Sequence, residues 1–75
     1  DVYKRQDYNL AVGYGEEGRV NEAMSILEVL IHRNPFFEPC WQLLILLNYG
    51  ENGYDSSMEL LRRARQVIGD SLSLR

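Results

Sequence analysis

The sequence of 75 residues repeats itself at a spacing of 34 positions. When it is shifted by that distance, apolar or small residues fall on apolar or small residues. The aligned pairs are Leu10 with Leu44, Ala11 with Ile45, Val12 with Leu46, Ala23 with Ser57, Met24 with Met58, Ile26 with Leu60, Leu27 with Leu61 and Leu30 with Ala64. A repeat of this length is a supersecondary unit that stacks on its neighbours, and about three units usually make a stable array. The sequence therefore predicts two stacked units and either a low melting temperature or concentration-dependent association.

The spacing of the apolar residues predicts that both units are helical. One helical face is formed by Val20, Ala23, Met24, Leu27, Leu30 and Ile31. This helix should end at Asn34-Pro35, because proline lacks an amide hydrogen and disfavours the helical conformation of its predecessor. We expect the next helix to run from Pro39 to about Tyr49 and another to run from Asp55-Ser56 to about Ile68, with Asn21 and Asp55 as caps. The expected fold is all-α, with four helices and no sheet.

The two units resemble the tetratricopeptide repeat, a helix-turn-helix of 34 residues. The first unit, residues 7–35, carries Leu10-Ala11-x-x-Tyr14, Gly18, Ala23-x-x-x-Leu27 and Pro35. The second carries a looser series, Trp41-x-x-Leu44-Ile45-x-x-Asn48, Ser57-x-x-x-Leu61 and Ala64. The sequence departs from the family pattern at Asp7, Asn48 and Gly69, where a large apolar residue, Tyr and Pro are usual. Gly53 also lies one residue later than the repeat requires.

This resemblance implies two antiparallel helix-turn-helix hairpins, residues 7–37 and 38–70, stacked as a fragment of a right-handed superhelix. Residues 71–75 would be a tail or a truncated continuation. The positions that define the repeat core would be Leu10, Ala11, Tyr14, Gly18, Ala23, Leu27, Leu30, Pro35, Trp41, Leu44, Ile45, Ser57, Leu61 and Ala64.

The first six residues have a composition of their own. DVYKRQ is the translation of GATGTGTATAAGAGACAG, which resembles the end sequence of transposon-based sequencing adaptors. We therefore expect residues 1–6 to be an artefact or a disordered start, in a metagenomic fragment of a longer protein. A genuine helix start is the alternative.

Gly13-x-Gly15-x-x-Gly18 matches the glycine fingerprint of dinucleotide-binding folds. That fingerprint requires a strand before it and a second strand about 20 residues later, where this chain has the proline-rich segment NPFFEP. Glu16 and Glu17 would also repel a pyrophosphate. The repeat instead predicts that Gly18 lies in the turn between two helices, where left-handed dihedral angles favour glycine. A nucleotide-binding enzyme fragment is therefore only a remote alternative. The roles of Gly13 and Gly15 stay open.

Composition and charge argue against several other functions. The net charge of -3 does not attract nucleic acids or anionic membranes, and the aliphatic run from Leu43 to Leu47 is too short to span a bilayer. A single cysteine, Cys40, excludes an internal disulfide and fits a reducing compartment, the cytoplasm. We therefore expect no direct nucleic-acid partner and no membrane partner.

The sequence also offers few groups for catalysis. His32 and Cys40 are the candidates for a nucleophile and its base, and their spacing does not bring them together. There is no cluster of metal ligands, and Arg62, Arg63 and Arg65 are expected on a solvated face with Glu59. We predict no enzyme activity, no catalytic or metal site and no cofactor.

The resemblance places a candidate binding groove on the first helix of each unit. There Pro39, Gln42, Leu46 and Tyr49 form a row whose first-unit equivalents are Arg5, Tyr8, Val12 and Gly15. In tetratricopeptide arrays these positions line a concave groove that receives a peptide or protein segment. We expect Tyr8, Val12, Gln42, Leu46 and Tyr49 to contact the partner. Because the row lacks the Lys and Asn of the family's carboxylate clamp, a terminal carboxylate is not the expected ligand.

Two other interpretations of this surface stay open. The row could pack against missing repeats of the parent chain, because large apolar patches mark interfaces of either kind. Alternatively, Pro35-Phe36-x-Glu38-x-x-Trp41-x-x-Leu44-Ile45, with Gly53 and Arg65, is similar to the bacterial transcriptional activator domain, a helical module attached to a winged-helix DNA-binding domain. That resemblance implies self-association or contacts with other proteins.

Overall fold

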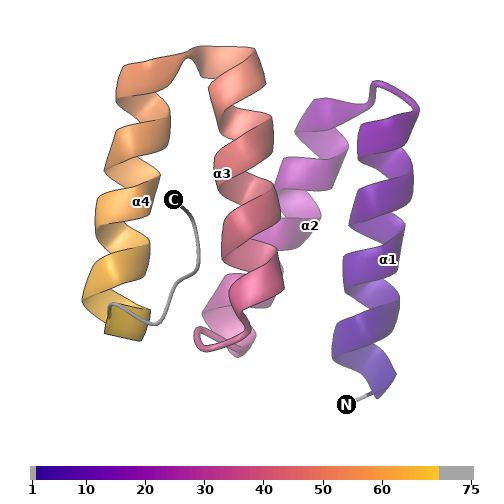
Figure 1. Cartoon of the computed structure of the whole chain (residues 1–75). Coiled ribbons are helices and arrows are strands. Elements are labelled where there is room, and N and C mark those ends of the chain that lie inside the picture. The colour runs from indigo at the N-terminus through magenta and orange to yellow at the C-terminus, as the bar shows by residue number, and fades with distance from the viewer. Residues whose placement is uncertain (1, 70–75) are drawn as a thin grey trace.

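The chain folds into two antiparallel helical hairpins (Figure 1). The computed structural model describes residues 2–69, with side chains from Arg5 onward. The helices are α1 (Val2–Glu16), α2 (Val20–Arg33), α3 (Glu38–Asn52) and α4 (Tyr54–Ile68). Helix α1 packs on α2, α3 packs on α4, and α3 joins the hairpins by packing on α2 and, over a smaller contact, on α1. The predicted all-α fold is confirmed, and residues 2–69 contain no strand.

The two hairpins follow the repeat register. Helices α2 and α4 begin at Val20 and Tyr54, which are 34 residues apart. Of the positions expected to define the repeat core, the buried ones are Ala11, Ala23, Leu27, Leu30, Trp41, Leu44, Ile45, Ser57 and Ala64. Tyr14, Pro35 and Leu61 are partly buried, and Gly18 is exposed in the turn between α1 and α2. Ile31, Cys40 and Leu60 complete the apolar core.

Leu10 does not belong to this core, contrary to the expectation. Its side chain is 51% exposed, whereas Leu44, its equivalent in the second hairpin, is 0% exposed. The reason is the number of neighbouring helices. Helix α3 lies against α2 on one side and α4 on the other, whereas no helix among the described residues covers the corresponding side of α1.

Two polar residues are buried between α3 and α4, and both are hydrogen-bonded. The Ser57 hydroxyl donates to the carbonyl of Ile45 at 3.1 Å. The Asn48 amide donates to the Ser56 hydroxyl at 2.8 Å, and its oxygen accepts from the Asn52 amide. The side chain of Asn48 is therefore hydrogen-bonded to α4 and within α3, as is usual for a buried polar group.

The predicted end of α2 is confirmed, but the predicted caps are wrong. Helix α2 ends at Arg33, where the Asn34 amide donates to the carbonyl of Leu30. Asn21 and Asp55 lie inside the first turns of α2 and α4, whose N-cap residues are Arg19 and Gly53 without a side-chain cap. Both helices start early because the carbonyls of these two N-cap residues already accept bonds from residues four positions later.

The glycines of the fingerprint lie in a helix and a turn. Gly13 and Gly15 are inside α1, and Gly18 has a φ of +84°, as its predicted place in a turn requires. A Cβ atom on Gly15 would lie 3.6 Å from the side chain of Leu47, whereas nothing lies within 4 Å of one on Gly13. The strand-turn-helix context of a dinucleotide site is absent from residues 2–69.

Helix α1 starts at Val2, so residues 2–6 continue the helix of the first hairpin. This conformation agrees with the alternative of a helix start. The expected tail, residues 71–75, and the last residue of the second predicted unit lie outside the described residues.

Candidate binding surface

The predicted partner-binding row runs along α1 and α3, which contact each other near both ends of the row. The ring of Tyr8 meets the ring of Phe37 edge to face, with centroids 5.8 Å apart. Near the end of α1, Gly15 lies against the side chain of Leu47. Tyr8, Val12 and Gly15 share one stripe of α1, because they are separated by four and three residues. This stripe therefore lies along the contact between α1 and α3.

The α3 part of the row is the more accessible part. Gln42, Leu46 and Tyr49 form one helical stripe, about 100° from the stripe of Leu43 and Leu47 that borders α1. Leu46 is 65% exposed and Tyr49 is 55% exposed, whereas Tyr8, Val12 and Gln42 are partly buried. The row thus offers two exposed large side chains beside a partly covered strip, and none of its five members is an acidic or basic residue.

Sequence reasoning missed a second apolar surface, which we call the α1–α2 face. Its members are Asp7, Tyr14, Ile26 and Val29, which line two hollows, and Leu10, which shares one stripe of α1 with Asp7 and Tyr14. Leu10 and Val29 are 51% and 50% exposed, and the other three are partly buried. This face could have been predicted from the 34-residue repeat. Asp7, Ile26 and Val29 lie 34 positions before residues that line the hollows beside α2 in the second hairpin.

The remaining polar candidates take part in local contacts. A ring nitrogen of His32 lies 2.8 Å from the carbonyl oxygen of Glu28, and the side chain is exposed. Cys40 is buried. Arg62 pairs with Glu59, and the guanidinium of Arg63 lies 5.7 Å from the ring centre of Trp41. Among the described residues, no three His, Cys, Asp or Glu side chains are placed to hold a metal ion.

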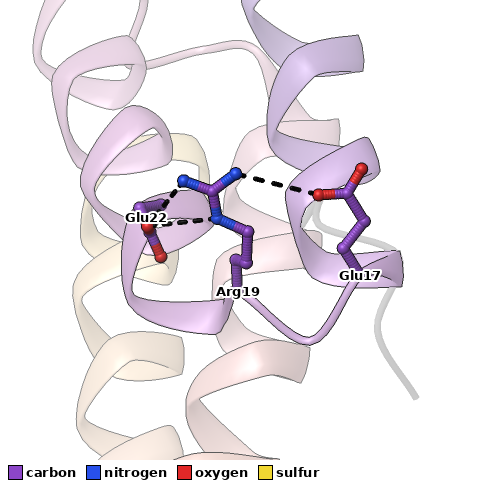
Figure 2. A network of polar contacts seen from close by, with 3 residues as sticks. All are labelled: Glu17, Arg19 and Glu22. Atoms are coloured by element: carbon purple, nitrogen blue, oxygen red, sulfur yellow. Dashed lines mark hydrogen bonds and ion pairs between the residues drawn. The ribbon is translucent and has the colours of Figure 1, made fainter.

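Three charged residues, Glu17, Arg19 and Glu22, form a cluster at the turn between α1 and α2 (Figure 2). The Arg19 guanidinium donates to the Glu22 carboxylate at 2.9 and 3.2 Å and lies 3.9 Å from Glu17. It also lies 4.5 Å from the ring centre of Tyr14. The hydrogen bond from Arg19 and the attraction of its charge lower the pKa of Glu22 and raise the pKa of Arg19.

This cluster predicts a pH dependence of stability. Because the folded-state pKa of Glu22 is below its unfolded value, its contribution is complete above the unfolded pKa and disappears as the pH falls through the lowered one. Thermal unfolding of the wild-type chain should therefore lose more stability between about pH 7 and pH 3 than unfolding of Glu22→Gln, which has no carboxylate to protonate. The two chains differ by this one carboxylate alone. Equal losses would contradict the prediction.

None of the helices formed by residues 2–69 combines the length and the apolar character that are needed to cross a membrane. Comparison of the chain with family models, with curated proteins and with solved structures finds no match.

Proposed function

We propose that the chain is a protein–protein interaction module of the tetratricopeptide type, which binds a segment of a partner protein along the row of α1 and α3. The partner segment would bury apolar side chains against Leu46 and Tyr49 and reach across Val12 and Tyr8, with Gln42 on the same stripe of α3. The module carries out no catalysis and needs no cofactor. With its single cysteine buried, it suits the cytoplasm.

The observation that supports this proposal is the exposure of Leu46 and Tyr49 on the helix that joins the hairpins. Large apolar side chains on a rigid helix, three residues apart, are the usual anchors of helix-based recognition. Both lie inside α3 rather than in a loop, and α3 packs on α2 and α4, so the backbone around them is held by two other helices. A partner would therefore meet a preformed surface and would spend little free energy on ordering it.

The proposal is tested by selecting peptides from a random phage-displayed library on the immobilised chain. Selected peptides, made synthetically and labelled, should bind the wild-type chain and lose affinity by about tenfold or more with Leu46→Asp or Tyr49→Asp, because each change removes the burial of a large side chain. Fluorescence polarisation measures the affinity, and circular dichroism checks that the variants are folded.

Val29→Asp is the matched control, because Val29 is an apolar helical residue that is 50% exposed on a different face. It should leave peptide affinity unchanged. Peptides that tolerate Leu46→Asp and lose affinity with Val29→Asp would place the binding site on the α1–α2 face and contradict the proposal.

A further inference from the structure

The two hairpins bury their equivalent residues to different extents. Leu10 is exposed and Leu44 is buried, and Tyr14 and Ile26 are partly buried where Asn48 and Leu60 are buried. The second hairpin is the more covered one because α2 lies against it. Two hollows mark this internal contact: one is lined by Ile31 of α2 with Trp41, and the other by Met24 and Glu28 of α2 with Asn48, Ser56 and Leu60.

The first hairpin has hollows at the same repeat positions. One is lined by Asp7, Ser25, Ile26, Val29 and Arg33. These residues lie 34 positions before Trp41, Glu59, Leu60, Arg63 and Val67, each of which lines one of the hollows beside α2. A second hollow is lined by Tyr14, Asn21, Glu22, Ser25 and Ile26. The α1–α2 face thus repeats the surface that receives α2, and none of the described helices occupies it.

Helix α4 carries the residues that could occupy this face. Met58, Arg62 and Arg65 lie 34 positions after Met24, Glu28 and Ile31, the residues with which α2 lines the internal contact. Arg62 and Arg65 are exposed and Met58 is partly exposed. Helices α2 and α4 start 34 residues apart, so each of these three residues lies as far from the start of α4 as its counterpart lies from the start of α2.

We propose that a second copy of this chain binds the α1–α2 face with its helix α4, head to tail, and so continues the stacking that joins the two hairpins within one chain. Two pairs of opposite charge support a second copy as the occupant, and one pair of like charge opposes it, because Arg33, the equivalent of Val67, lines the same hollow as Asp7 and would also lie near Arg65. Within one chain, Ile31 of α2 and Trp41 of α3 line one hollow. In the proposed contact, Arg65 of one copy takes the place of Ile31, and Asp7 of the next copy takes the place of Trp41. These two residues have opposite charges. Glu28 of α2 and Ser56 of α4 line the other hollow within one chain. In the proposed contact their places are taken by Arg62 of one copy and Glu22 of the next, which again have opposite charges.

Apolar contacts accompany these ion pairs. Met24 and Leu60 line one hollow of the internal contact, and their equivalents are Met58 on one copy and Ile26 on the next. The proposed contact uses two different surfaces of the chain, so that each added copy presents a new α1–α2 face and growth does not close at two copies unless the rotation forms a ring. This inference does not depend on the proposed partner-binding row, because Leu46 and Tyr49 take no part in it.

Analytical ultracentrifugation of the whole chain tests the proposal with two complementary variants. The average mass of the wild-type chain should rise with concentration up to about 1 mM. Val29→Asp blocks the α1–α2 face and Met58→Asp blocks the α4 surface, so each variant alone should be a monomer. An equimolar mixture should form a 1:1 dimer and nothing larger, because each variant retains the surface that the other lacks. Leu46→Asp, on the partner-binding row, should associate like the wild-type chain.

Charge reversal tests the register at two exposed or partly exposed positions, where the variants are expected to fold even if the apolar ones do not. Asp7→Arg and Arg65→Asp should each weaken association by about tenfold or more, because like charges then oppose each other across the contact. The double variant Asp7→Arg/Arg65→Asp should restore it. A wild-type chain that is monomeric at about 1 mM, a Met58→Asp variant that dimerises by itself, or a double variant as weak as the single ones would overturn the proposal.

Discussion

Replacing Leu44 by alanine should lower the free energy of unfolding by about 2–5 kcal/mol, whereas the same change at Leu10 should cost less than about 1 kcal/mol. Leu44 is 0% exposed in the core, so truncation removes buried methyl groups and leaves a cavity. Leu10 is 51% exposed, and water replaces the atoms that are lost. The two residues are identical in type and equivalent in repeat position, so the difference isolates the effect of the neighbouring helix.

Urea denaturation followed by far-UV circular dichroism measures both changes. The chain should be kept dilute, because association of folded copies adds apparent stability. If Leu44→Ala is unfolded without urea, both changes are made in a Gly13→Ala background. That background change places a better helix former inside α1, where nothing lies within 4 Å of the added Cβ atom, and should add up to about 1 kcal/mol. Equal costs for Leu10 and Leu44 would show that Leu10 is covered and would contradict the structure of the first hairpin.

The same pair also responds to the proposed self-association. At high protein concentration Leu10 lies in the contact between copies, so that Leu10→Ala should then cost more than it does in dilute solution. The cost of Leu44→Ala should stay the same, because Leu44 is buried within each copy. The comparison therefore separates burial inside the chain from burial between chains.

The parts of the fold that were predictable are those that local rules determine. The end of α2 follows from Pro35, and the inward face of α2 follows from an apolar spacing that is consistent with one buried stripe. Gly18 was expected in a turn and has the positive φ that such a turn uses. These features depend on a few neighbouring residues, and no distant contact competes with them.

The errors concern features that depend on other segments. A repeat pattern says which residues face inward, but it does not say whether a helix is present to cover them, and for that reason Leu10 was placed in the core. The caps were misplaced because the backbone of Arg19 and Gly53 starts α2 and α4 without help from a side chain. The contact of Gly15 with Leu47, on which the sequence makes no prediction, likewise depends on how α1 and α3 pack.

The connection between α3 and α4 is a single residue, Gly53, and its replacement is expected to lower the stability of the chain strongly. Gly53 is both the C-cap of α3 and the N-cap of α4, with φ of 94° and ψ of -175°. This region of dihedral space is essentially restricted to glycine, and a residue with a Cβ atom held there is strained by about 1–3 kcal/mol. Gly53→Ala should therefore destabilise the chain by that amount. No atom lies within 4 Å of the added Cβ, so the cost comes from the backbone alone.

Gly50→Ala provides the control for Gly53, since the same chemical change three residues earlier should have the opposite sign. Gly50 lies inside α3, where nothing lies within 4 Å of an added Cβ atom, and alanine there should add up to about 1 kcal/mol through helix propensity. A chemically synthesised chain with D-alanine at position 53 extends the test, because the observed dihedral angles are the mirror image of an allowed β conformation. D-Alanine should be tolerated or stabilising, as it restricts the unfolded chain without strain. If L-alanine and D-alanine gave equal stability, the connection would not hold the positive φ on which the direct joining of α3 to α4 depends.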